Sequence, residues 1–85
     1  MKKWYMYVVE CSDGSLYTGI TTDIKRRVLE HNYGDKGAKY TKSRRPVELR
    51  MINEHEDQSS ALRAEYRFKK LSRSKKLQII KERKE

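Results

Sequence analysis

The chain has 85 residues and a mass of 10.2 kDa, and its 21 Lys and Arg against 12 Asp and Glu leave a net charge of +9. This length predicts one domain over residues 1–85 with one compact core, and the periodic apolar runs exclude a disordered basic tail. No apolar stretch approaches the roughly 20 residues of a membrane span, and neither a signal-peptide pattern nor a second cysteine is present, so we expect a cytoplasmic protein with no membrane partner and no disulfide.

The first two predicted elements are strands that form a hairpin. Residues from Lys3 to Cys11 are almost continuously apolar or aromatic, which is typical of a strand covered on both faces and predicts the central strand of a sheet. The turn signal Ser12-Asp13-Gly14 follows, and Ser15 to Ile20 is the second predicted strand. Cys11 is expected to be a small core residue.

The length of this turn decides which side chains share a face of the sheet. A two-residue turn would place Tyr7 and Tyr17 on opposite faces. A three-residue loop with Gly14 in the left-handed conformation would pair Tyr7 with Gly19, put both tyrosines on one face and leave open space over the glycine. The sequence leaves both registers open.

A helix is predicted after the hairpin. Thr22 can cap a helix from Asp23 to about Asn32, and Gly34 is suited to end it. At about 100° per residue, Arg27 and His31 lie one turn apart along the inward edge of this helix.

The next segment is the most basic part of the chain. We call residues 36–45 the basic segment; it has no acidic residue and five cations, which are Lys36, Lys39, Lys42, Arg44 and Arg45. A field of this kind attracts polyphosphates, so we expect these residues to bind nucleic acid; a solvated surface loop is the alternative. Contacts from four to six cations to duplex phosphates would give a salt dependence with a slope of roughly −4 to −5.

The last predicted elements are a strand and two helices. Alternation over Val47 to Asn53 predicts a strand with one apolar face formed by Val47, Leu49 and Met51. Asp57 can cap a helix through Leu71, and a shorter basic helix follows to about Arg83. Glu65 falls within the apolar arc of the first of these helices, where a carboxylate needs a cation or a metal as partner. The order ββαβαα predicts an α/β domain with a small three-stranded antiparallel sheet flanked by helices.

Two short motifs and three single residues resemble the GIY-YIG nuclease family. Tyr5-Met6-Tyr7 stands at the first motif and Tyr17-Thr18-Gly19 at the second, while Arg27, His31 and Glu65 stand at the family's arginine, histidine and metal-binding glutamate. The resemblance runs across nearly the whole chain and is closest to small standalone bacterial members of uncharacterised function. Tyr5 replaces a glycine and Thr18 an isoleucine, and no lysine follows the second motif.

This resemblance implies a metal-dependent endonuclease that hydrolyses phosphodiester bonds in DNA rather than RNA. It implies one Mg²⁺ or Mn²⁺ ion held by Glu65, with Tyr7 as the base or proton relay for an attacking water. His31 could accept the proton through Tyr7, Arg27 would stabilise charge at the phosphate, and Tyr17 would donate a hydrogen bond there. Because a free tyrosine has a pKa of about 10, holding a phenolate at pH 7 would cost roughly 4 kcal/mol unless Arg27 or the metal lowers that pKa.

Two other functions stay open from sequence alone. A non-catalytic nucleic-acid-binding module could retain the nuclease scaffold as a packed core. Alternatively, the enzyme could be inactive until a protein partner supplies substrate recognition.

Overall fold

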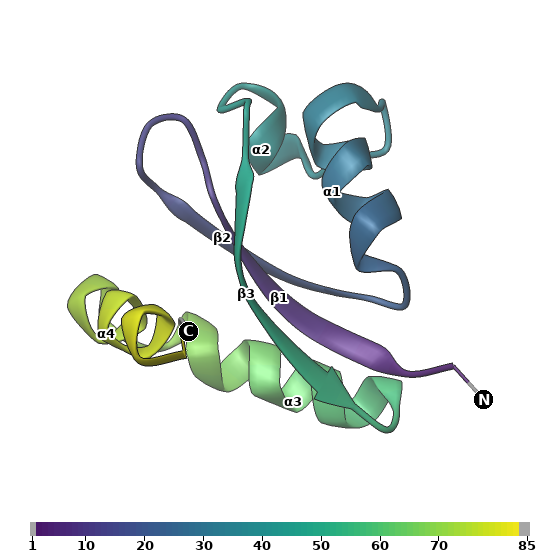
Figure 1. Cartoon of the computed structure of the whole chain (residues 1–85), viewed down its shortest axis with the longest axis vertical. Helices are drawn as coiled ribbons and strands as arrows, with labels where there is room; N and C mark the ends of the chain where they lie inside the picture. Colours follow the sequence, from purple (N-terminus) through teal and green to yellow (C-terminus); the bar gives the residue numbers. More distant parts are fainter. Residues whose placement is uncertain (1, 84–85) are drawn as a thin grey trace.

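A three-stranded antiparallel sheet forms the centre of the computed structural model, which describes residues 2–83. The strand order is β2-β1-β3, so β1 is central, as the sequence predicts (Figure 1). The strands are β1 (Trp4–Glu10), β2 (Leu16–Thr21) and β3 (Glu48–His55). The predicted fold class is confirmed, with boundaries that differ by one or two residues.

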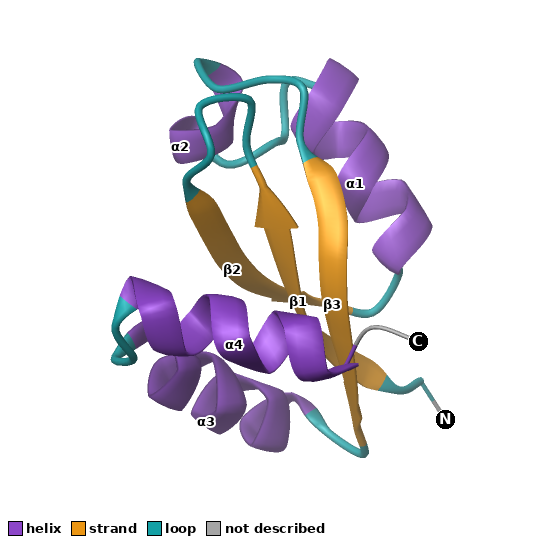
Figure 2. Ribbon diagram, turned by 60° about the vertical axis from the view of Figure 1, so that its left-hand side comes forward, coloured by secondary structure: helices purple, strands orange, loops and turns teal. Residues whose placement is uncertain are grey.

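Four helices cover the two faces of the sheet. They are α1 (Ile24–Tyr33), α2 (Lys39–Lys42), α3 (Gln58–Lys69) and α4 (Arg73–Arg83). Helices α1 and α2 lie on one side of the sheet, and α3 and α4 on the other (Figures 1 and 2). The short helix α2 lies inside the basic segment, where the sequence analysis predicts only a loop. Across residues 2–83, none of these helices is both long and apolar enough to traverse a bilayer.

The hairpin adopts the longer of the two turns that the sequence allows. Tyr7 pairs with Gly19, and Val9 pairs with Tyr17. Gly14 has a φ of +86°, the left-handed conformation that a three-residue loop requires of this glycine. Tyr7 and Tyr17 therefore lie on the same face of the sheet, the face that α1 and α2 cover.

The side chains of β1 alternate between two cores of different character. On the α3 and α4 side lies the apolar core, whose buried residues are Met6, Val8, Met51 and Phe68. On the α1 side lies the aromatic core, whose buried residues are Tyr7, Val9, Cys11 and Val47. Cys11 is a buried core residue, as expected. Of the candidate catalytic residues, Tyr7 and Tyr17 belong to the aromatic core.

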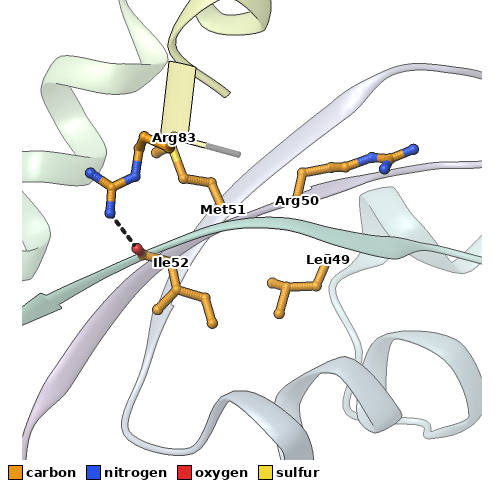
Figure 3. Close-up of a pocket in the computed structure, with 5 residues that line it drawn as sticks. All are labelled: Leu49, Arg50, Met51, Ile52 and Arg83. Atoms are coloured by element: carbon orange, nitrogen blue, oxygen red, sulfur yellow. Dashed lines mark hydrogen bonds between the residues drawn. The ribbon is translucent and has the colours of Figure 1, made fainter. Parts of the chain in front are cut away.

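Strand β3 differs from the predicted simple alternation. Val8 pairs with Met51 but Val9 pairs with Leu49, so Arg50 is an extra residue that forms a β-bulge. The bulge turns Leu49 toward the aromatic core and leaves Met51 in the apolar core (Figure 3). The prediction of one apolar face is therefore wrong, because one unpaired residue shifts every later side chain to the other face.

Aspartates cap α1 and α3, the helices that carry Arg27, His31 and Glu65. The Asp23 side chain accepts the backbone N–H of Arg26 at 3.1 Å, so Asp23 caps α1 in place of the predicted Thr22. The Asp57 side chain accepts the N–H of Ser60 at 2.8 Å and caps α3 as predicted. Each of these bonds satisfies an otherwise unpaired amide in the first turn.

Candidate active site

A buried hydrogen bond between β1 and α1 lies at the centre of the candidate site. The Tyr7 hydroxyl lies 2.6 Å from Nε2 of His31, and the two residues are 1% and 0% exposed. The sequence analysis predicts both residues as site residues and predicts that His31 faces inward. The structure brings them into direct contact.

Gly19 makes room for this tyrosine. A Cβ atom built on Gly19 would lie 2.7 Å from the Tyr7 hydroxyl oxygen and 2.9 Å from its Cζ. The expected open space over Gly19 is therefore filled, because the Tyr7 ring itself lies across the glycine. A larger residue here would push the phenol away from His31.

Tyr17 extends the site along the same face. Its ring centroid lies 6.5 Å from that of Tyr7 and 5.3 Å from that of His31. On its outer side, Tyr17 stacks on Tyr40 with centroids 6.0 Å apart, and the Arg44 guanidinium lies 4.0 Å from the Tyr40 ring centroid. These rings form a continuous aromatic column from the buried site toward the basic segment.

Two hydrogen bonds hold the guanidinium of Arg27 in place. Its guanidinium donates to Glu30 at 2.9 Å and to the backbone oxygen of Lys36 at 2.8 Å. Because these contacts come from α1 and from the basic segment, they fix the guanidinium at the edge of the site. Only 23% of the Arg27 side chain is exposed.

Burial dominates the electrostatics of the central pair. Removal from water raises the pKa of Tyr7 to about 12, although Arg27 opposes this by hydrogen bonding and by its charge. Burial and the positive charge of Arg27 lower the pKa of His31 to about 4, with a smaller contribution from Arg45. Of the two routes that the sequence leaves open, a phenolate stabilised by Arg27 alone is disfavoured, since desolvation outweighs the nearby cation.

Glu65 lies in the layer opposite Tyr7 and His31. It lies on α3, which packs on the apolar core, and its charge is among the smaller causes that raise the pKa of Tyr7. Its side chain is 18% exposed, and a carboxylate oxygen lies 3.1 Å from Nζ of Lys69. The carboxylate is thus mostly buried and has a cationic partner, one of the two arrangements that its position predicts.

The five cations of the basic segment fall into two groups. Arg45 donates to the backbone oxygens of His31, Glu30 and Gly34, so it anchors the end of α1. Arg44 pairs with Asp13 at 3.1 Å. Lys36, Lys39 and Lys42 are exposed, and their ammonium groups form no ion pair within the described residues. Only these three lysines are placed to meet a phosphate without giving up an internal contact.

The comparison with known families identifies this arrangement. The GIY-YIG catalytic domain matches residues 3–78 of the chain. The chain belongs to the GIY-YIG family. Among GIY-YIG relatives, a UPF0213 protein of Halobacterium salinarum is 58% identical over 72 residues, which cover 85% of this chain and 92% of that protein. A UPF0213 protein of Syntrophus aciditrophicus is 52% identical over 82 residues, or 96% of this chain and 94% of that protein.

Two solution NMR structures share the GIY-YIG architecture described here. The UPF0213 protein of Bacillus halodurans has a TM-score of 0.62 and 44% identity, covering 95% of this chain and 85% of that one. A protein of Enterococcus faecalis has a TM-score of 0.64 and 43% identity, with the same two coverages. The prediction that the chain resembles small standalone GIY-YIG proteins is confirmed.

Two neighbours of the GIY-YIG site are missed by sequence reasoning. Thr41 is 0% exposed, and its hydroxyl lies 2.9 Å from Nδ1 of His31. Tyr40 stacks on Tyr17. Both lie in the basic segment, where the surrounding cations predict an exposed loop and give no sign that Thr41 is buried or that the half-exposed Tyr40 stacks on Tyr17.

Proposed function

We propose that this GIY-YIG protein is a metal-dependent endonuclease that hydrolyses phosphodiester bonds in DNA. The observation that carries the proposal is the buried contact of Tyr7 with His31, with Arg27 and Tyr17 beside it. A phenol joined to a neutral imidazole provides a route for a proton, and an adjacent guanidinium suits a phosphate. Membership in a nuclease family supports nucleic acid as the substrate.

The residues fit a single hard cation. Mg²⁺ and Mn²⁺ favour oxygen ligands, and Mg²⁺ keeps several waters, so the mostly buried Glu65 carboxylate and substrate oxygens would suffice to hold it. Within the described residues there is no group of three or more His, Cys, Asp or Glu that could hold a metal without substrate. When bound, the ion would supply positive charge against the charge that develops on the phosphate.

Tyr7 acts as a relay in this mechanism. A phenolate at pH 7 would cost roughly 7 kcal/mol for a pKa of about 12, so a standing phenolate is disfavoured. Instead, the Tyr7 oxygen takes a proton from the attacking water while its own proton moves to Nε2 of His31. The water oxygen forms a bond to phosphorus as the bond to the leaving oxygen breaks, and solvent protonates the leaving oxygen.

The remaining site residues orient the substrate. Arg27 stabilises the phosphate as negative charge develops, and Tyr17 donates a hydrogen bond to a phosphate oxygen. The exposed lysines of the basic segment hold the flanking DNA backbone, which positions the substrate without reading its sequence.

Cleavage assays with matched variants test this function. Branched and single-stranded DNA would be incubated with Mn²⁺ and the native protein, Tyr7→Phe, and the double variant Glu65→Ala, Arg27→Ala. Loss of the Tyr7 hydroxyl should lower kcat by about 10²-fold or more, the usual range for general acid–base catalysis. Glu54→Ala removes a carboxylate from β3 that pairs with Lys3, so it should leave cleavage unchanged. Equal residual activity in the native protein and the double variant would show that the activity comes from a contaminant.

The burial of the central pair favours one alternative, a nucleic-acid-binding module without catalysis. Tyr7 and His31 are as inaccessible as ordinary core residues. This alternative expects salt-sensitive DNA binding that survives Glu65→Ala but not the loss of Lys39 and Lys42, with no cleavage under any metal. Cleavage that emerges only when a co-purified protein is added would instead indicate a partner-dependent nuclease.

A further inference from the structure

Thr41 contributes a buried hydroxyl behind the imidazole of His31. The residue is 0% exposed and lies in α2, within the basic segment. Its hydroxyl oxygen lies 2.9 Å from Nδ1 of His31 and 2.9 Å from the backbone oxygen of Ala38. It therefore contacts the ring nitrogen that does not face Tyr7.

The hydroxyl proton of Tyr7 determines which ring nitrogen of His31 is protonated. Among residues 2–83, Nε2 of His31 is the hydrogen-bonding partner of the Tyr7 hydroxyl that can accept its proton. Arg27, which also acts on this hydroxyl, can only donate. A buried hydroxyl without an acceptor is costly, so Nε2 must be bare, and a neutral imidazole then carries its proton on Nδ1.

The proton on Nδ1 needs an acceptor in turn. The backbone N–H of Ala38 points at Nδ1 over a long 3.4 Å and by itself would favour a bare Nδ1, whereas the Thr41 hydroxyl oxygen lies closer, at 2.9 Å. The Thr41 oxygen can accept, because its own proton can be donated to the Ala38 carbonyl. The chain of donors therefore runs from Tyr7 to His31, from His31 to Thr41, and from Thr41 to Ala38.

We propose that Thr41 is a positioning residue that fixes His31 in the tautomer protonated on Nδ1, leaving Nε2 free to receive the Tyr7 proton. The role of Thr41 in catalysis rests on the proposed nuclease function, whereas the tautomer of His31 does not depend on that function. Among residues 2–83, removing the hydroxyl leaves the Ala38 N–H as the hydrogen-bonding partner of Nδ1, which favours a bare Nδ1 and moves the proton to Nε2. Nε2 would then be a donor and could no longer accept from Tyr7.

Long-range ¹H–¹⁵N NMR of the labelled full chain tests the tautomer directly. We expect native His31 and Thr41→Ser to be protonated on Nδ1, and Thr41→Val to be protonated mainly on Nε2. Thr18→Val makes the same change at a buried threonine on the other side of β2 and should leave His31 as in the native protein. Native His31 protonated on Nε2, or an unchanged tautomer in Thr41→Val, would overturn the inference. If Thr41→Val does not fold, Thr41→Ala is the second variant that lacks the hydroxyl.

Kinetics separate this inference from the nuclease proposal. In Mn²⁺-dependent DNA cleavage, Thr41→Val should lower kcat by about 10²-fold with little change in KM, because a wrong tautomer blocks proton transfer and not binding. Thr41→Ser should restore most of kcat. If the tautomer moves as expected and no protein cleaves DNA, the nuclease proposal fails and the role of Thr41 stands. If the native protein cleaves and Thr41→Val cleaves equally fast, the role of Thr41 fails alone.

Discussion

His31 is held neutral inside the aromatic core by burial and by two nearby arginines. Arg27 and Arg45 disfavour its protonation, Glu30 favours it, and burial is the largest influence. The ring also donates and accepts hydrogen bonds at once, through Nδ1 and Nε2. Protonating this imidazole at rest would bury a charge, and a ring already protonated on Nε2 could not receive the Tyr7 proton, so the fold and the proposed relay both start from the neutral form.

This requirement predicts an acid-sensitive stability. Because the pKa of His31 is lowered to about 4 in the folded state from an ordinary 6.5, its contribution is complete above pH 6.5 and is lost as the pH falls toward 4. We expect the free energy of unfolding to fall by roughly 3 kcal/mol across this range, measured by urea denaturation. His31→Gln should lack this loss, whereas His55→Gln should retain it. A native protein equally stable at both pH values would contradict the burial of a neutral His31.

A second residue-scale prediction concerns the glycine beneath Tyr7. Gly19→Ala places a methyl group 2.7 Å from the Tyr7 hydroxyl oxygen, and should lower the free energy of unfolding by about 1–3 kcal/mol. Tyr7→Phe removes the atom in closest contact, so the double variant should lose less stability than the sum of the two single variants. Strict additivity in denaturant titrations would show that the alanine is accommodated elsewhere.

How far single residues could be predicted depends on whether a pattern exposes them. Tyr7, Tyr17 and His31 were predicted because motif spacing and helical geometry are both visible in the sequence, and the structure gathers them. Thr41 could not be predicted, because a hydroxyl between lysines looks like any surface residue until α2 turns it inward. The pKa of Tyr7 could not be predicted either, since desolvation depends on packing and not on composition.

At the scale of elements, the sequence predicts well which segments are helices or strands, but predicts poorly how the strands pair. The sequence leaves the hairpin register open because Asp13-Gly14 suits both turn lengths. The folded hairpin, in which Gly14 is left-handed, resolves it. The bulge at Arg50 is invisible because the strand alternates regularly in sequence. The end of α1 is secured by Asn32, which exchanges two hydrogen bonds with the backbone of Val47, at 2.6 Å and 3.1 Å. Such contacts join distant segments and leave no local pattern.

Helix α3 carries a prediction about metal binding. Lys69 lies one helical turn from Glu65, and its Nζ is 3.1 Å from the Glu65 carboxylate. This ammonium group therefore competes with an incoming cation. Lys69→Gln should raise the apparent Mn²⁺ affinity by about two- to five-fold, the range of an exposed ion pair, measured from the Mn²⁺ dependence of DNA cleavage. Lys70→Gln removes the same charge next to the Tyr66 ring and should change affinity less. Equal gains in both variants would indicate a general charge effect, and Glu65→Gln should abolish the binding.

At the scale of the whole molecule, only part of the positive charge behind the net +9 is free to meet a ligand. Arg44 and Arg45 serve internal contacts, which leaves Lys36, Lys39 and Lys42 as the exposed cations of the basic segment. Contacts from these three lysines correspond to a slope of roughly −3 in log K against log salt, smaller than five free cations would give.

Paired variants test this assignment on duplex DNA. The double variant Lys39→Gln, Lys42→Gln should reduce the magnitude of the salt slope by roughly 2, because two phosphate contacts are lost. Lys75→Gln with Lys81→Gln removes the same charge from α4, on the other side of the sheet, and should leave the slope close to the native value. If both double variants lower the slope equally, the protein binds DNA through its diffuse charge and not through the basic segment.

The two-sided burial of β1 has a consequence for how accurately the site is built. Met6 and Val8 enter the apolar core while Tyr7 and Val9 enter the aromatic core, so a slip of one residue would force phenol and thioether to exchange environments. The apolar core, which contains neither Tyr7 nor His31, thereby sets the height of the Tyr7 hydroxyl above Gly19. Packing of one core thus fixes the positions of the side chains in the other core.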